Sequence, residues 1–190
     1  MKFNRIPETT FQQIQLGAGV ILSEFDPATG EFDLANIIGA TSGGLNFNAS
    51  PAFSDYGEDI DNCPKNTMEL KRLDSWDVSL EGSYVTASPD SVASTIGAAD
   101  VSGNKITPRN DLKLADFKDV WWVGDYSDNN SETGGGYVAV YMKNALSTGG
   151  FQIQSTDRAK GRFDFTYTAH YSIADQTTVP FEVYVQAGTA

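Results

Sequence analysis

Few residues in this sequence of 190 could carry nucleophilic catalysis or bind a transition metal. His170 is the single histidine and Cys63 the single cysteine. His170 lies within a run of alternating polar and apolar residues, which favours a position on the polar face of a β-strand. Cys63 lies in an acidic segment, and carboxylates beside a thiol oppose formation of the nucleophilic thiolate. A Cys–His pair remains an open alternative that no spacing in the sequence supports.

Acidic segments offer oxygen ligands of the kind that calcium prefers. Residues 125–132 contain three carboxylates among Ser and Asn, but they lack the glycine and terminal glutamate of an EF-hand loop. Residues 55–61 are equally acidic. Solvated loops routinely carry such residues, and no feature selects a pair of carboxylates for glycoside hydrolysis. We therefore predict a protein without a cofactor, a metal or an enzymatic activity.

The charge balance argues against nucleic-acid binding. Thirteen Lys and Arg stand against 25 Asp and Glu, which gives a net charge of −12. Proteins that grip DNA need basic residues to replace the phosphate counterions, and the longest basic run here is Lys71-Arg72. The acidity could serve solubility alone, or it could repel DNA.

Targeting and membrane signals are missing from the sequence. It contains no stretch of 18 apolar residues and no apolar region near its N-terminus that would suggest a signal peptide. A single cysteine excludes an internal disulfide and favours a reducing compartment. We expect a soluble protein that is made in a cytoplasm and has no membrane partner.

Alternation with a period of two is the dominant pattern of the sequence. Residues 76–84, 163–173 and 181–186 each place apolar side chains on one face and polar side chains on the other. This pattern is typical of strands that cover a core on one side and face water on the other. In the last run the predicted core residues are Phe181, Val183 and Val185.

Two further runs, 120–123 and 137–142, are apolar on both faces, which predicts strands covered on both sides, either by a helix or by another subunit. A hairpin is also expected near the N-terminus. It would join residues 19–25 to residues 31–38 through a turn at 26–30, where Pro27 presets φ and Gly30 accepts a positive φ.

The capping signals of a single helix are clear. Ser88 can cap its N-terminus, Pro89 suits the first helical position and Gly97 can end it. The predicted fold class is therefore mainly β, a β-sandwich or barrel-like fold with one short packed helix. The apolar stripe of that helix is predicted to comprise Val92, Ala93 and Ile96.

The domain organisation is predicted to be one β domain, residues 17–190, preceded by an N-terminal arm, residues 1–16. Residues 46–66 are rich in Asn, Ser, Pro, Asp and Gly and predict a long loop within the domain. Arms and loops of this kind gain most when they cross onto a neighbouring subunit. The residues of these segments that are predicted to contact neighbouring subunits are Phe3, Ile6, Phe11, Asp55, Glu58 and Asp59.

Several segments, taken in order, carry a family resemblance. The arm leads into LGAGVIL at 16–22, and MELKRLDSWDVSLEG follows at 68–82. After the single helix come DVWWVGD at 119–125 and VPFEVYV at 179–185. Together they resemble the major tail proteins, or tail-tube proteins, of long-tailed bacteriophages, most closely those of phages that infect Gram-positive bacteria.

This resemblance implies a structural virion protein without catalysis or cofactor. Six copies would form a hexameric ring, and stacked rings would form a tube through which DNA passes as non-specific cargo during ejection. The six residues named above in the arm and the long loop would then make the contacts between stacked rings. The implied partners are further copies of the chain, together with terminator, tape-measure and distal tail components. The implied location is the virion tail, assembled in the cytoplasm of the host bacterium.

The sequence also suggests which carboxylates would line such a tube. Asp77, Glu81 and Asp164 occupy the polar faces of two predicted strands. A negatively charged channel discourages phosphates from sticking. We therefore predict that these three residues face the lumen, with the exterior of the tube as the alternative position.

Two other kinds of protein remain as alternatives. The inner tube of a contractile tail, or a tail-terminator ring, would have a similar β fold. A carbohydrate-binding β-sandwich module is suggested by Trp121, Trp122 and the tyrosines, although adjacent tryptophans in a strand place at least one ring in the core.

Overall fold

The computed structural model describes residues 6–7, 10, 13–126 and 135–187. This part of the chain is mainly β, as predicted, with one α-helix and three short 3₁₀ turns. The strands are β1 (Gln15–Leu22), β2 (Thr41–Asp55), β3 (Lys71–Tyr84), β4 (Ala99–Ser102), β5 (Lys105–Pro108), β6 (Lys118–Tyr126), β7 (Tyr137–Ser147), β8 (Gln152–Gln154), β9 (Arg162–Thr168) and β10 (Phe181–Gln186). The helix is α1 (Pro89–Ile96), and the 3₁₀ turns are η2 (Leu34–Asn36), η3 (Met68–Leu70) and η4 (Leu114–Asp116).

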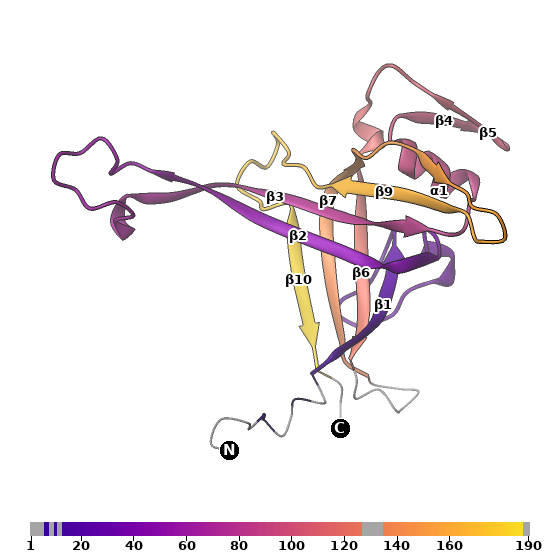
Figure 1. Ribbon diagram of the computed structural model, residues 1–190, viewed down its shortest axis with the longest axis horizontal. Helices are drawn as coiled ribbons and strands as arrows, with labels where there is room; N and C mark the ends of the chain where they lie inside the picture. Colours follow the sequence, from indigo (N-terminus) through magenta and orange to yellow (C-terminus); the bar gives the residue numbers. More distant parts are fainter. Residues whose placement is uncertain (1–5, 8–9, 11–12, 127–134, 188–190) are drawn as a thin grey trace.

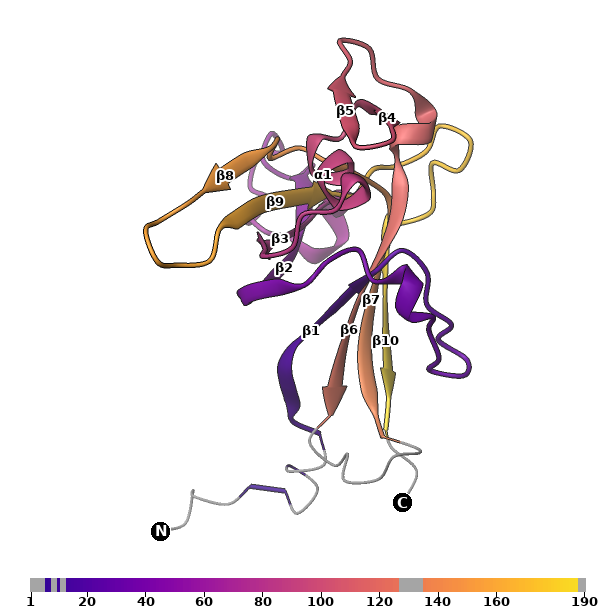
Figure 2. The same cartoon turned by 90° about the vertical axis from the view of Figure 1, so that its right-hand side faces the viewer.

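Eight of the strands form an antiparallel arrangement that divides at β7 into two sheets (Figures 1 and 2). The first sheet has the order β1-β6-β7-β10, and the second has the order β2-β3-β9-β8. The C-terminal end of β7 joins them, because Leu146 and Ser147 pair with β9. Strands β4 and β5 form a separate hairpin.

The first sheet is covered on both faces, as the two doubly apolar runs predicted, but by other parts of its own chain rather than by a helix or another subunit. Ile21, Val140 and Met142 contribute to the main core, which also contains residues of the second sheet. On the opposite face, Trp121 and Ala139 belong to a second cluster with Phe25 and Ile37 of the segment that follows β1. The adjacent Trp121 and Trp122 therefore point into different clusters.

The helix begins and ends where its capping signals predicted. The Ser88 side chain accepts a hydrogen bond from the Ser91 N–H, Pro89 opens the helix, and Gly97 ends it with φ of 83°. The predicted apolar stripe was only partly right, because Val92, Ala93 and Ile96 are half-buried while Ser91 and Thr95 are fully covered. Small residues on this face let α1 pack closely, and the Ser147 hydroxyl donates to the Thr95 carbonyl at 2.6 Å.

The prediction of a loop over residues 46–66 was wrong for its first half. Strand β2 continues to Asp55 and pairs with β3 from Asn46 opposite Glu81 to Asp55 opposite Lys71. The polar residues that suggested a loop lie on the outward face of this hairpin, where they are compatible with a strand. Pro51 is tolerated because β2 is an edge strand.

Two further strand predictions were wrong, one about a face and one about a strand itself. In β10, Val183 and Val185 are 51% and 64% exposed, whereas Tyr184 packs against the second cluster. Residues 31–38 form no regular strand and keep only two isolated bridges, Asp26 to Glu31 and Leu22 to Ile37. The turn itself is as predicted, with Gly30 at φ of 75°.

Candidate functional site

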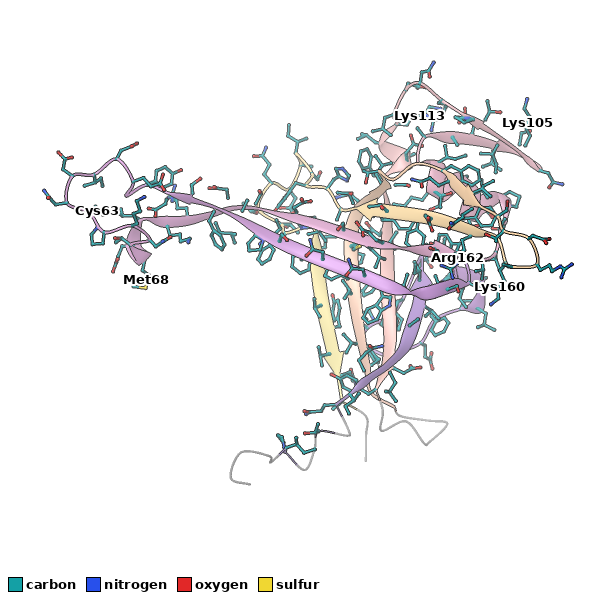
Figure 3. All side chains as sticks on the ribbon, in the orientation of Figure 1. Cys63, Met68, Lys105, Lys113, Lys160 and Arg162 are labelled. Carbon is teal, nitrogen blue, oxygen red and sulfur yellow. The ribbon has the colours of Figure 1, made fainter. Side chains whose placement is uncertain are left out.

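The two residues with the most reactive side chains do not come together. Cys63 lies in the connection at the far end of the β2–β3 hairpin (Figure 3), where its sulfur lies 3.5 Å from the Thr67 hydroxyl. His170 follows β9 in the body, with Nδ1 3.2 Å from the Asn144 carbonyl and its ring edge-on to Phe117. Both contact sets are structural, so the open alternative of a Cys–His pair finds no support.

Metal ligands are likewise scattered. Within residues 6–7, 10, 13–126 and 135–187, no three His, Cys, Asp or Glu side chains form a group that could hold a metal ion. Most of the oxygen-rich segment 125–132 lies outside the described residues. The surfaces that the fold sets apart are those of the second sheet.

The β2–β3 hairpin extends well beyond the body of the molecule (Figure 1). The chain exposes 12839 Å², whereas a compact monomer of its mass would expose roughly 8,900 Å². Large apolar side chains gather on the outer part of the hairpin and its connection. Their exposed fractions are 54% for Phe53, 58% for Tyr56, 52% for Ile60, 80% for Met68 and 49% for Leu73.

A register shift in the hairpin keeps its apolar residues on one face. The inner part pairs Phe47 with Leu80 and Ala49 with Val78 over the main core. Between Ala52 and Phe53 the register shifts, so that Asp74 has no paired residue on β2 and Leu73 lies opposite Phe53. The apolar face of the second sheet therefore continues past the end of the core.

The tip of the hairpin is closed by its own polar groups. The two oxygens of the Asp55 carboxylate accept hydrogen bonds from the Gly57 N–H at 2.9 Å and the Asn66 N–H at 3.1 Å. The nearby cations fold back onto rings, with Lys71 Nζ 5.2 Å from the Phe53 centroid and the Arg72 guanidinium 5.8 Å from that of Tyr56.

The six predicted stacking residues thus differ in their surroundings. Asp55 closes the tip, while Glu58 and Asp59 are exposed within it. Ile6 is 64% exposed. Phe3 and Phe11 lie outside the described residues.

The outward face of the second sheet is polar across all four strands. Glu81 lies opposite both Asn46 of β2 and Thr166 of β9, and Asp77 lies opposite Ser50. Asp164 lies opposite Ser83, whose hydroxyl donates to it at 2.5 Å. The three carboxylates predicted to line a lumen therefore share one face of one sheet.

Sequence reasoning overlooked a cationic cluster at the other end of the second sheet. Arg158, Lys160 and Arg162 line a hollow of about 550 Å³ beside the β8–β9 connection. Their spacing at every second residue was the available signal, but a search for contiguous Lys and Arg passes over it.

A second charged group holds the β4–β5 hairpin in place. Arg109 Nε lies 3.0 Å from Asp100 Oδ1, and its terminal nitrogen lies 2.5 Å from Asp116 Oδ1. The Lys113 N–H, and then the Arg109 guanidinium, lower the pKa of Asp116. Because these charged side chains form ion pairs with one another, we assign the group a structural role.

Comparison with known proteins identifies no family. No protein-family model and no curated protein sequence matches the chain. Among solved structures, a chain from the virion of a native gene transfer agent particle is similar, with a TM-score of 0.42 and 10% identity, over 90% of this chain and 96% of that chain. Similarity at this level says nothing about function. None of the helices in the described part of the chain is long and apolar enough to cross a membrane.

Proposed function

We propose that this chain is a structural subunit of a phage-like virion, and specifically a tail-tube protein whose copies form stacked rings of six. The observation that carries the proposal is the second sheet. Its outward face is polar from edge to edge, while its apolar face runs past the core along a projecting hairpin. A monomer leaves that apolar strip in water, whereas an assembly covers it.

The edges of the second sheet suit a ring. Strand β2 forms one edge and β8 the other, and neither is covered by a further strand in the described part of the chain. The exposed edge of a sheet can pair with a strand of another chain. In a ring of identical subunits, such pairing would join neighbouring copies. Different edges on each copy form a heterologous contact, and such contacts close into rings or continue as filaments.

In this proposal the polar face lines the channel. Asp77, Glu81 and Asp164 would face passing DNA, surrounded mainly by hydroxyl and amide side chains, with Arg162 at one end of the same face as a cation beside them. The N-terminal arm and the hairpin tip would reach the adjacent ring. Terminator, tape-measure and distal tail proteins would contact the two ends of the tube, and assembly would take place in the host bacterial cytoplasm.

Negative-stain electron microscopy of the purified chain over a range of concentrations tests the proposal directly. Hollow rings or tubes are expected at high concentration. Compact monomers at every concentration, with no closed or stacked particle, would contradict it. Removing residues 1–10 should leave a folded subunit that forms rings but not long tubes, and long tubes from the truncated chain would show that the arm is not a stacking element.

The lining residues need a separate test. Tubes of the D77K/E81K/D164K variant, assembled with a short DNA duplex, should protect that duplex from nuclease, whereas wild-type tubes should protect none. Reversal of Glu24, Glu31 and Asp111, which lie off the second sheet, is the matched control. If the DNA bound by the triple variant is fully digested, the carboxylates lie on the outside of the tube.

A further inference from the structure

The two ends of the molecule's long axis carry opposite charges. Cys63 marks the hairpin tip at one end, and Lys160 and Arg162 lie at the other (Figure 3). Residues 55–66 contain four acidic residues and one lysine, while residues 155–162 contain three cations and one aspartate. These ends cannot meet within one copy, because the whole second sheet separates them.

The tip presents its carboxylates outward. Glu58, Asp59 and Asp61 are exposed, and in the described part of the chain they take no hydrogen bond or ion pair. Two of the nearby cations, Lys71 and Arg72, lie against the aromatic rings of the hairpin, which leaves Lys65 within the tip to offset part of the negative charge. The outer end of the hairpin therefore offers a compact negative surface beside exposed apolar side chains.

The hollow at the opposite end has the complementary character. Besides Arg158, Lys160 and Arg162 it is lined by Ser42, Gln154, Thr156 and Ala159, and none of these lining residues is acidic. Asp157 lies outside it, 3.7 Å from Arg158 Nε, with both side chains more than 90% exposed. An ion pair this exposed contributes little and leaves the guanidinium available.

Both ends of the second sheet also expose apolar side chains. On β8, Ile153 is 61% exposed, and Phe151 just before it is 40% exposed. Ile153 lies opposite Phe163, which packs against the main core. The apolar face of the second sheet thus runs beyond the core at β8, as it does at Phe53 and Leu73.

We propose that the acidic hairpin tip of one copy docks in the cationic hollow of a second copy, head to tail. Three free carboxylates meet three cations, and the exposed apolar residues beside them are covered together. The contact is heterologous, so it can propagate from copy to copy. It rests on the proposed function only in taking another copy of this chain as the occupant.

Charge reversal on each side tests this docking. The tip variant E58K/D59K/D61K and the hollow variant R158E/K160E/R162E should each raise the concentration needed for assembly by about tenfold or more. Light scattering measures that concentration, and far-UV circular dichroism checks that each variant is folded. Reversal of Glu24, Glu31 and Asp111 is the control and should leave assembly unchanged.

Mixing the two variants gives the decisive result. In an equimolar mixture, the positive tip of one variant meets the negative hollow of the other, and the unchanged tip meets the unchanged hollow. Co-assembly at close to the wild-type concentration is expected. If the mixture assembles no better than its components, the proposed pairing of tip and hollow is wrong.

Cross-linking locates the contact independently of particle shape. The native Cys63 at the tip and a T156C substitution in the hollow should form intermolecular disulfide ladders under mild oxidation, whereas a T177C control in the β9–β10 connection should not. Equal ladders from both would overturn the docking. Ladders specific to T156C, without rings or tubes in the microscope, would uphold the docking and refute the tail tube.

DNA is the competing occupant of the cationic hollow. A duplex that binds wild-type chain and loses its binding in the hollow variant, while the mixed variants fail to co-assemble, would assign the hollow to nucleic acid and overturn the proposal. We expect no measurable binding of a short duplex at physiological salt, because three cations on a chain of net charge −12 attract it weakly.

Discussion

The two sheets differ in how much of their apolar surface the chain itself covers. The first sheet packs against the second on one side and against the segment after β1 on the other, and its central strands are buried. The second sheet is covered on one side only, and its apolar face extends past the core at the hairpin. Stability therefore resides around the junction of the sheets, while the outer hairpin leaves apolar surface exposed to water.

The comparison is testable because β3 passes through both environments. Leu80 is 1% exposed in the main core, whereas Leu73 on the same strand is 49% exposed. Burial makes the first residue a determinant of folding. Because Leu73 is exposed, it contributes little to the stability of the monomer.

The largest expected effect is on the free energy of unfolding. Leu80→Ala should lower it by about 3 kcal/mol, because a buried methyl-rich side chain is lost and a cavity remains. Leu73→Ala should change it by less than about 0.5 kcal/mol. Urea denaturation of both variants, at a concentration where the chain is monomeric, measures the difference. Equal losses would mean that the outer hairpin contributes to the monomer's stability as much as the core does.

A smaller effect, on assembly rather than on unfolding, is expected for Phe53 and Leu73, the exposed pair on the hairpin. The F53S/L73S variant should fold normally but require about tenfold more protein to assemble. Serine at these two positions removes apolar surface whose burial between copies would favour assembly. Sedimentation velocity over a concentration series provides the measurement. The substitutions V101S and L112S, at exposed positions on and after the β4–β5 hairpin, serve as the control. Unchanged assembly of F53S/L73S would show that the strip is not an interface.

The smallest expected effect concerns an ion pair on the first sheet. Lys143 and then the Tyr184 hydroxyl hydrogen-bond to Glu182 and lower its pKa below the ordinary 4.5. The resulting stabilisation is present above pH 4.5 and is lost as the pH falls through the folded pKa. Glu182 is 42% exposed, so screening keeps the contribution below about 1 kcal/mol.

Thermal unfolding of wild type and E182Q between pH 3 and pH 7 checks this last prediction. The midpoint difference should be greatest at neutral pH and should shrink as the pH falls. A difference that grows on acidification would reverse the assigned direction of the pKa shift.

Sequence reasoning found the parts of the fold that depend on local patterns. The alternation around Leu80 and around Phe165 identified β3 and β9, because each strand buries one face. Ser88, Pro89 and Gly97 located the helix, because capping depends on a few neighbouring residues.

The features that it missed depend on distant partners. The polar stretch before Asp55 is a strand because β3 pairs with it along its length, which composition alone does not reveal. Val183 and Val185 alternate correctly, but the covered side of β10 is set by Trp121, on which Tyr184 packs. Alternation placed Asp77, Glu81 and Asp164 on the polar faces of their strands, whereas the pairing of β3 with β9 brings them onto one face, and their position relative to the proposed channel depends on other copies of the chain.

The order in which the strands pair has a consequence for folding. The β2–β3 hairpin is local in sequence, so it can form early, whereas its neighbour β9 pairs with β3 across 81 residues between Ser83 and Asp164. Long-range pairing of this kind is slow. Until β9 arrives, the inner apolar strip of the hairpin around Phe47 and Leu80 is open to water. Under the proposed function, a copy could assemble only after β9 has been synthesised and has paired with β3, which would separate the folding of each copy in time from its incorporation into a larger particle.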